Sequence, residues 1–157
     1  FSNTSAVLDH VPNVGSNIGM ALPDADAETD IAAVPGRLHV MRGRINVPSN
    51  PEFGASKHVA RMLLAVTAVD PAVRGAINLR TTDELLAAAA EQGLQAVAFE
   101  ASYENRFERI RSLLADRGGV PSILYHEGAF GIEPIAYVLG ESATAAVETA
   151  VDCLRAV

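Results

Sequence analysis

The chain has 157 residues, of which 49% are hydrophobic, and it carries a formal net charge of −7. This length and composition predict one globular domain over residues 1–157, and the acidic balance argues against direct binding of DNA or RNA. The single cysteine, Cys153, excludes an internal disulfide, and no apolar run reaches the length of a membrane span. We therefore expect a cytoplasmic protein with no membrane partner, in which Cys153 is a buried small hydrophobe rather than a catalytic thiol.

The acidic surplus and the near absence of lysine fit either a salt-adapted, halophilic protein or GC-rich coding. The sequence begins at Phe1 rather than at a methionine. We expect residues 1–10 to be the remnant of a linker and the chain to be a fragment of a longer polypeptide, with another domain upstream.

A glycine-bracketed turn is predicted over residues 13–19. Gly15 permits positive φ and close approach of the backbone to a ligand, while Ser16 and Asn17 offer polar contacts. An ordinary turn explains this segment equally well, because the glycine spacing matches neither a Walker nor a Rossmann motif.

The next stretch contains loops and one hairpin. Residues 23–28 read as a polar acidic loop. Residues 38–41 and 44–47 predict two strands that turn at Arg42 and Gly43. A rigid loop over residues 48–51 then leads to the most informative segment of the chain.

That segment surrounds Lys57, the only lysine among 12 basic residues. Ser56 can cap a helix whose periodicity runs to Pro71, and the free N–H groups and helix dipole at its start attract anions. The alternative is a solvated first turn with an ordinary cap. The spacing predicts a phosphate site formed by Gly54, Ala55, Ser56, Lys57, His58 and Arg61.

Strands and helices alternate through the rest of the chain. Together with the early hairpin, this alternation predicts an α/β layered domain with a mixed sheet. The expected strands cover residues 75–80, 94–99, 122–125 and 135–139, and the expected helices are 85–92 behind a capping box of Thr81 and Glu84, one around 107–114, and one after Ser142.

Two of these strands carry further candidate ligand contacts. Asn78 and Arg80 can present an amide and a guanidinium from one strand face, although an ordinary polar face is the alternative. His126, Glu127 and Gly128 stand at a strand-to-loop junction, where ligands often bind in α/β sheets. No other histidine or cysteine has the spacing of a companion ligand, so we expect no structural zinc site and assign no metal ligands.

The other charged residues are interpreted as surface features. His10 and His39 read as surface or satisfied polar residues. The arginines of the third helix, Arg106, Arg109 and Arg111, alternate with Glu104 and Glu108 and predict a solvated face with internal ion pairs.

Five segments together resemble the ThiN domain family. The resemblance runs in order over nearly the whole chain and implies a three-layer α/β/α domain with a mixed central sheet, related to class II aldolases of the AraD and HMP-phosphate kinase type. The zinc-binding His-x-His pattern of those aldolases is absent here. The segments are residues 14–23, 32–37, 53–61, 76–80 and 125–134.

The resemblance implies one of two activities. ThiN domains act as thiamine-phosphate synthases behind a kinase domain, or as ligand sensors of thiamine-responsive repressors behind a helix-turn-helix domain. A tryptophan-containing segment usual in the synthases is missing, so we expect a sensor of thiamine phosphate or a phosphorylated precursor. Such a sensor touches DNA only through its upstream domain and forms a homodimer.

For the alternative, a synthase, the resemblance implies that Arg37 and His58 are catalytic. Arg37 would neutralise the departing pyrophosphate, and His58 would hold a phosphate or donate a proton to it. Mg²⁺ is then the expected cofactor, with Glu52 or Glu127 as candidate contacts.

Overall fold

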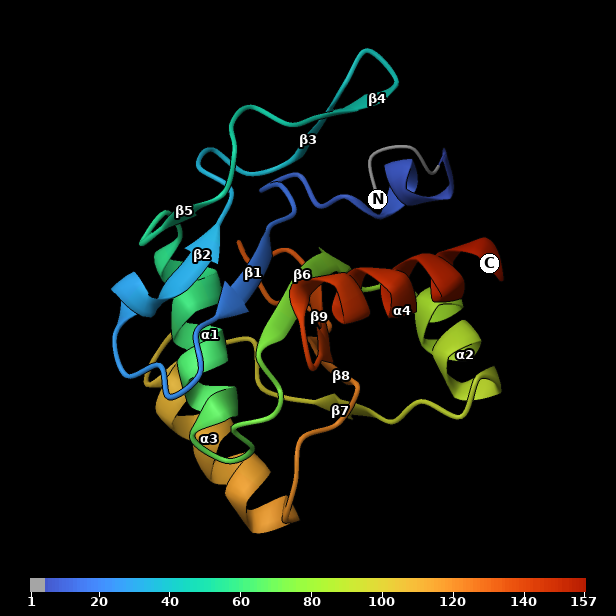
Figure 1. Ribbon diagram of the computed structural model, residues 1–157. Helices are drawn as coiled ribbons and strands as arrows, with labels where there is room; N and C mark the ends of the chain where they lie inside the picture. The colour runs from blue at the N-terminus through green and yellow to red at the C-terminus, as the bar shows by residue number, and fades with distance from the viewer. Residues whose placement is uncertain (1–4) are drawn as a thin grey trace.

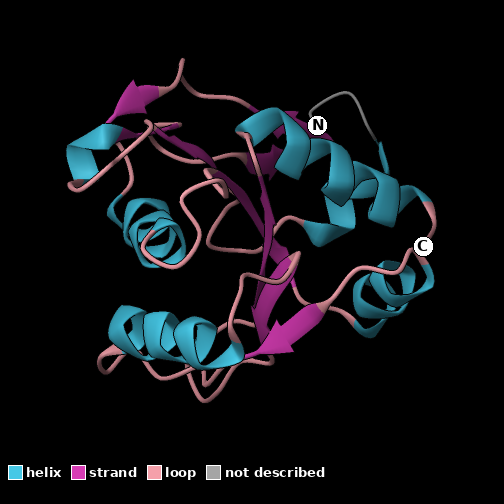
Figure 2. Cartoon of the chain, turned by 60° about the horizontal axis from the view of Figure 1, so that its bottom comes forward, coloured by secondary structure: helices cyan, strands magenta, loops and turns pink. Residues whose placement is uncertain are grey.

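The computed structural model describes residues 5–157 (Figure 1). At its centre lies a seven-stranded sheet in the order β5-β2-β1-β6-β9-β8-β7. Figure 2 shows this sheet nearly edge-on with helices on both sides, which confirms the expected α/β/α layers. The strands are β1 (Ile18–Ala21), β2 (Ile31–Ala33), β3 (His39–Met41), β4 (Arg44–Asn46), β5 (Glu52–Phe53), β6 (Gly75–Arg80), β7 (Ala96–Ala98), β8 (Ile123–His126) and β9 (Ile135–Gly140). The α-helices are α1 (Lys57–Thr67), α2 (Asp83–Glu91), α3 (Arg106–Arg117) and α4 (Ala143–Arg155), and the 3-10 helices are η1 (Ser5–His10) and η2 (Glu28–Asp30).

The two faces of the sheet are covered by different helices. Alternate residues of β9 point to opposite sides, as the pleat of a strand requires. Tyr137 and Leu139 pack in the core under α1 and α3, whereas Ala136 and Val138 pack in the core under α2 and α4. The sheet is therefore buried on both faces at its centre, which accounts for the nearly continuous apolar sequence of β9.

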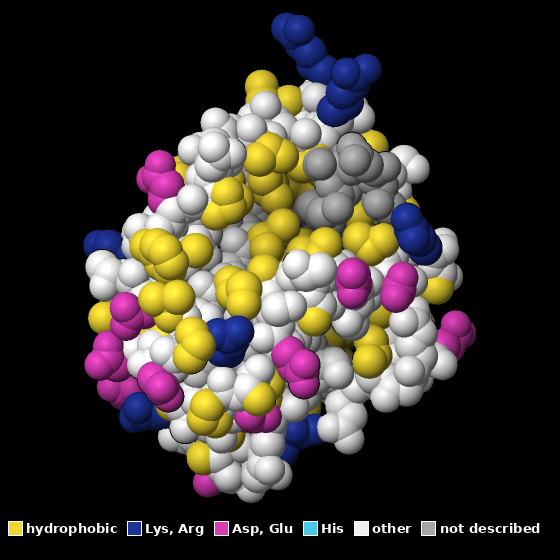
Figure 3. Space-filling view, viewed as in Figure 1, with side chains coloured by type: hydrophobic (Ala, Val, Ile, Leu, Met, Phe, Trp, Pro, Cys, Tyr) yellow, Lys and Arg dark blue, Asp and Glu magenta, His cyan; other side chains and the backbone are white. Residues whose placement is uncertain are grey.

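The sheet is mixed, as expected, although the reason differs from the one that the sequence suggested. Its strands pair antiparallel except for β7 and β8, which run parallel. The hairpin predicted over residues 38–47 is confirmed as β3 and β4, but these form a separate two-stranded sheet. This hairpin projects at the top of Figure 1, and basic side chains stand out at its tip in Figure 3.

Three short strands were missed in the sequence. Gly19, read as the end of a turn, lies inside β1 and pairs with Ala33 on one side and Ala76 on the other. A Cβ atom on Gly19 would lie 2.6 Å from Val59 Cγ1, so glycine lets α1 approach the sheet. Strands β1, β2 and β5 are short and contain mostly glycine, alanine or exposed residues, which give little β-propensity signal.

The N-caps of α1 and α4 are the serines that the sequence predicted. The Ser56 hydroxyl accepts a hydrogen bond from the Val59 amide at 3.4 Å, and Ser142 caps α4 in the same way. The cap of α2 is Thr82, one residue later than predicted. The hydroxyl of Thr81 instead donates to the carbonyl of His126 at 3.1 Å, which ties β6 to the end of β8.

The N-terminal segment packs against the domain. Of the predicted linker over residues 1–10, residues 1–4 lie outside the described part, and η1 buries Val7 and His10 against α4. Over residues 5–157, no helix is long and apolar enough to cross a membrane.

Candidate functional site

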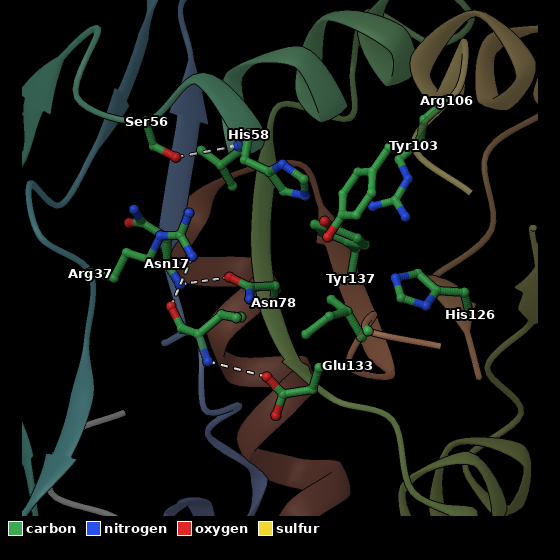
Figure 4. Close-up of a pocket in the computed structure, with 14 residues that line it drawn as sticks. Asn17, Arg37, Ser56, His58, Asn78, Tyr103, Arg106, His126, Glu133 and Tyr137 are labelled. Carbon is green, nitrogen blue, oxygen red and sulfur yellow. Dashed lines mark hydrogen bonds between the residues drawn. The ribbon is translucent and has the colours of Figure 1, made fainter. Parts of the chain in front are cut away.

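Two adjoining cavities lie at the start of α1, next to β1, β6 and β9. Figure 4 shows the residues that line the inner one. The inner cavity has a volume of about 320 Å³ and the outer cavity about 550 Å³. The residues that line both are Val14, Asn17, Arg37, Ser56 and His58. The inner cavity adds Val59, Asn78, Tyr103, Arg106, His126, Gly131, Glu133, Ile135 and Tyr137, and the outer cavity adds Val34, Gly36, His39, Ala55, Lys57 and Arg61.

The start of α1 brings the predicted lysine segment to these cavities. The left-handed φ of Gly54 (+74°) turns the chain just before the helix. Lys57 and Arg61 line the outer cavity, and His58 lines both cavities. Arg61 forms an ion pair with Glu28 at 2.8 Å, so its charge is partly compensated, whereas Lys57 has no such partner among the described residues. The outer cavity is therefore cationic, as a phosphate site requires.

Arg37 stands at the junction of the two cavities. Its backbone is left-handed (φ +62°), and its Nη1 donates to the Val14 carbonyl at 2.8 Å. The side chain of Asn17 bonds to Val34 twice, through its amide at 3.1 Å and its carbonyl oxygen at 2.9 Å, and so fixes the loop that carries Arg37. A buried amide thus positions the guanidinium.

The side chain of Asn78 fixes the loop before β1, which carries Gly15 and Asn17. Its Oδ1 accepts from the Asn17 amide N–H at 2.6 Å, and its Nδ2 donates to the Gly15 carbonyl at 3.1 Å. Asn17 and Asn78, both predicted as ligand contacts, do line the inner cavity, but their amide groups largely bind backbone. Their main role in the free protein is to hold the cavity wall.

Gly15 and Ser16, both predicted as ligand contacts, lie behind the side chains that line the cavities. Gly15 has φ +88°, and a Cβ atom there would lie 2.7 Å from His39 Cε1, so only glycine fits. The Ser16 hydroxyl is fully buried and makes no hydrogen bond with the described residues. Neither residue lines a cavity.

Four other predicted contacts, Gly54, Arg80, Glu127 and Gly128, lie outside both cavities. Arg80 donates to the Val11 carbonyl at 3.4 Å and lies 3.8 Å from Glu133, so it fastens the loop before β1. Glu127 is exposed, and Gly128 (φ +80°) forms a tight turn in which a Cβ atom would lie 2.6 Å from the Ile132 carbonyl. Gly128 therefore shapes the turn beside the site and is not placed to contact a ligand in either cavity.

The inner cavity contains side chains that the sequence did not single out. Arg106 was predicted to lie on a solvated helix face, and this is wrong: only 3% of it is exposed. Its guanidinium lies 4.2 Å from the centre of the Tyr103 ring and 5.7 Å from that of Phe99. The segment before α3 folds back over the helix start, and sequence periodicity alone does not reveal this.

The rings of His58, Tyr103, His126 and Tyr137 line the inner cavity, and Phe99 and Phe107 pack against two of them without lining either cavity. His58 stacks on Tyr137 at 6.3 Å between ring centres and meets Phe107 edge-on at 5.8 Å. His126 meets Phe99 edge-on at 5.2 Å. The inner cavity can therefore enclose a flat heteroaromatic ring between ring faces and edges.

Burial, together with nearby cationic side chains, suppresses protonation of both site histidines. Burial, reinforced by the charges of Arg106, Arg37 and Arg61, lowers the pKa of His58 to about 4. Burial and the neighbouring Arg106 lower the pKa of His126 to about 4, and burial raises the pKa of the Tyr137 hydroxyl far above its ordinary value. All three side chains are neutral at pH 7 in the free protein.

These shifts predict that the protein loses stability as the pH falls below 6.5. In the unfolded chain both histidines gain protons below about pH 6.5, whereas in the folded chain they stay neutral until about pH 4. The unfolded state then binds more protons, so the free energy of unfolding falls by up to about 1.4 kcal/mol per pH unit for each histidine. Urea unfolding at pH 7, 6 and 5 measures this slope. His126→Asn should remove roughly half of it, and a slope that this variant leaves unchanged would contradict the assignment.

No metal site is formed by the described residues, in which no three histidine, cysteine, aspartate or glutamate side chains gather. Glu52 pairs in β5 at the sheet edge, and like Glu127 it is exposed and lines neither cavity. The carboxylate in the inner cavity, Glu133, accepts hydrogen bonds from the Asn13 and Val14 amides at 2.7 and 3.1 Å.

The chain resembles known proteins of thiamine biosynthesis. The family described as "Thiamine-phosphate synthase ThiN" matches residues 1–152. Thiamine-phosphate synthase ThiN of Methanothermobacter thermautotrophicus is 31% identical over 155 residues, which cover 92% of this chain and 82% of that protein. The bifunctional thiamine biosynthesis protein ThiDN of Methanocaldococcus jannaschii is 31% identical over 144 residues, or 88% of this chain and 34% of that protein. This chain thus spans about a third of the bifunctional relative.

Solved structures agree on the fold. The C-terminal domain of a phosphomethylpyrimidine kinase superposes with a TM-score of 0.81 at 28% identity, and the match covers 94% of each chain. An aldolase II superfamily protein from Pseudomonas syringae gives a TM-score of 0.53 at 13% identity, over 97% of this chain and 70% of that one. This second likeness concerns the fold alone and confirms the predicted class II aldolase-like architecture. The family match over residues 1–152 and the 31% identity to a relative over most of both chains show that the chain belongs to the thiamine-phosphate synthase ThiN family.

Proposed function

We propose that this protein is a thiamine-phosphate synthase, which joins hydroxymethylpyrimidine pyrophosphate to thiazole phosphate and releases pyrophosphate. The observation that carries the proposal is the pair of joined cavities, one cationic and one lined by aromatic rings, with Arg37 at their junction. The name of the relative that this chain matches over 82% of its length supports the same activity.

The reaction places clear demands on such a site. The thiazole nitrogen attacks the methylene carbon of the pyrimidine, so a C–N bond forms while the C–O bond to pyrophosphate breaks. The bonding electrons leave with the pyrophosphate oxygen, and positive charge builds up on the pyrimidine methylene. Arg37 faces the leaving oxygen from the junction, and the buried ring of Tyr137 shields the cationic carbon from water on its side of the inner cavity.

His58 has a more limited role than a proton donor. With a pKa of about 4, its imidazole is neutral in the free site and donates one N–H hydrogen bond to a phosphate oxygen. A bound phosphate raises this pKa, because negative charge favours the imidazolium. Proton donation to the leaving group therefore depends on the anion binding first.

Among residues 5–157, no three histidine, cysteine, aspartate or glutamate side chains gather to hold the expected Mg²⁺ by protein ligands alone. No carboxylate cluster faces the cavities, and Glu133 is engaged by two backbone amides. We therefore assign no step of the reaction to residues that hold a metal.

The sensor function that we expected from the sequence uses the same pocket. A repressor sensor needs to bind thiamine phosphate without turning over its precursors, and its DNA-binding domain lies outside this chain. The relatives' names favour the synthase, so the sensor becomes the outcome in which the protein binds the product and makes none.

The proposal is tested by a turnover assay with purified protein, both substrates and Mg²⁺. We expect thiamine phosphate only when both substrates are present, and a rate that His58→Ala lowers at least tenfold. Binding of thiamine phosphate without product from the two precursors would overturn the proposal in favour of the sensor.

A further inference from the structure

Arg106 is a buried cation whose charge no acidic side chain balances. Its Nε donates to the Ser102 carbonyl at 3.2 Å and its Nη2 to the Ala101 carbonyl, while aromatic rings lie over its guanidinium. Among residues 5–157, no carboxylate lies within ion-pair distance of it. Burial of an uncompensated charge is costly unless a partner arrives, so this arginine is prepared for an anion.

The open side of Arg106 faces the inner cavity. Figure 4 shows its guanidinium beside the Tyr103 ring, on the side of the cavity that His126 lines. The Nδ1 atom of His126 accepts from the Gly128 amide at 3.2 Å, which leaves Nε2 to carry the proton. His126 is only 1% exposed, and buried polar atoms are usually hydrogen-bonded, but this Nε2 makes no hydrogen bond with the described residues. In the inner cavity, the Nε2–H of His126 thus lacks an acceptor and the guanidinium of Arg106 lacks a counter-charge.

We propose that Arg106 and His126 form a second anion-binding position, separate from the one at Lys57, and that it takes the phosphate of the thiazole substrate. Lys57 and Arg61 line only the outer cavity, and Arg106 and His126 line only the inner one. The inference rests on the proposed function for the identity of the ligand, and on the structure for the existence of two positions.

The distribution of charge assigns the two anions. The outer cavity has Lys57, Arg61 and the shared Arg37, which suits the more highly charged pyrophosphate. The inner position has one arginine and a neutral imidazole, which suits a phosphate monoester. With the anions at opposite ends, the thiazole and pyrimidine rings meet between them beside Arg37, as in-line displacement of pyrophosphate requires.

The wild-type protein tests the existence of two positions. The affinity for thiazole phosphate is measured by calorimetry without and with saturating inorganic pyrophosphate. Two positions predict that pyrophosphate changes this affinity less than threefold. A fall in proportion to the pyrophosphate concentration means competition for one shared position, and it would overturn the inference whatever the turnover assay shows.

Arg106→Gln tests the assignment, because glutamine keeps a donor for the loop carbonyls and loses the charge. It should weaken thiazole phosphate at least tenfold and leave both pyrophosphate and the unphosphorylated thiazole alcohol within threefold. Lys57→Ala should show the opposite preference. Arg109→Gln is the matched control, because Arg109 donates to the same Ser102 carbonyl at 2.6 Å but lines neither cavity.

The possible results separate this inference from the proposed function. Loss of thiazole phosphate binding in Arg106→Gln but not in Arg109→Gln supports the inner position even if no thiamine phosphate is ever made. Equal weakening of the phosphate and the alcohol, or of both anions, would mean that Arg106 acts only on structure and would overturn the inference. If Arg106→Gln does not fold, the competition measurement on the wild-type protein decides.

Discussion

Arg37→Ala should lower kcat for thiamine phosphate formation by about 100- to 1,000-fold, the loss found when one preorganised donor to a developing anion is removed. Arg37 lines both cavities, so the proposed function places it between the leaving pyrophosphate and the pyrimidine ring. Its contact at 2.8 Å with the Val14 carbonyl holds the guanidinium there before substrate binds, so little reorganisation is needed during the reaction. Steady-state kinetics with each substrate varied in turn measures the effect.

Arg42→Ala is the matched control for this variant. Both arginines have a left-handed backbone, with φ of +62° at Arg37 and +52° at Arg42, so both substitutions cause similar strain. Arg42 is exposed at the turn of the β3–β4 hairpin and lines neither cavity. A kcat for Arg37→Ala within threefold of that for Arg42→Ala would show that the junction charge plays no part in the chemistry.

The second large effect concerns the framework of the site. Gly75→Ala should lower the free energy of unfolding by about 3 kcal/mol, because overpacking against rigid backbone is among the most destabilising single changes. An added Cβ atom at Gly75 would lie 2.0 Å from the carbonyl carbon and oxygen of Ser142, the residue that caps α4. The change forces apart the first residue of β6 and the start of α4, and backbone has little freedom to yield.

Gly119→Ala provides the comparison. Nothing lies within 4 Å of a Cβ atom built on Gly119, and its backbone is not in the left-handed region, so its unfolding free energy should stay within about 0.5 kcal/mol of the wild type. Urea denaturation of the two variants measures the difference. Similar stability of Gly75→Ala and wild type would mean that β6 and α4 are less closely packed than described.

The sequence predicted those helix starts and strands that depend on residues close together in the chain. Ser56 and Ser142 cap helices because a side-chain oxygen reaches an amide three residues on, and neighbouring residues alone decide that. Strand β6 has its predicted bounds. Its apolar residues alternate between the two cores on opposite faces of the sheet. The short strands β1, β2 and β5 depend on partners distant in the chain, and the sequence carries little trace of those pairings.

The site was predictable in part for the same reason. Arg37, Asn78 and the lysine segment apart from Gly54 line the cavities. Arg106 was missed because its spacing on α3 looks like a solvated face, and its burial arises from the chain segment that carries Tyr103 folding over it. His126 was placed correctly at a strand end and lines the inner cavity, whereas its neighbour Glu127 is exposed and lines neither cavity.

One measurement tests the central claim most directly: the stoichiometry of a single turnover. Excess protein is mixed with both substrates, and thiamine phosphate and inorganic pyrophosphate are quantified together over time. We predict that the two products appear at the same rate in a 1:1 ratio, and that neither appears when thiazole phosphate is left out. Pyrophosphate without thiamine phosphate would indicate a hydrolase. If neither product forms and the protein nevertheless binds added thiamine phosphate, the chain is a binding domain and the synthase proposal is contradicted.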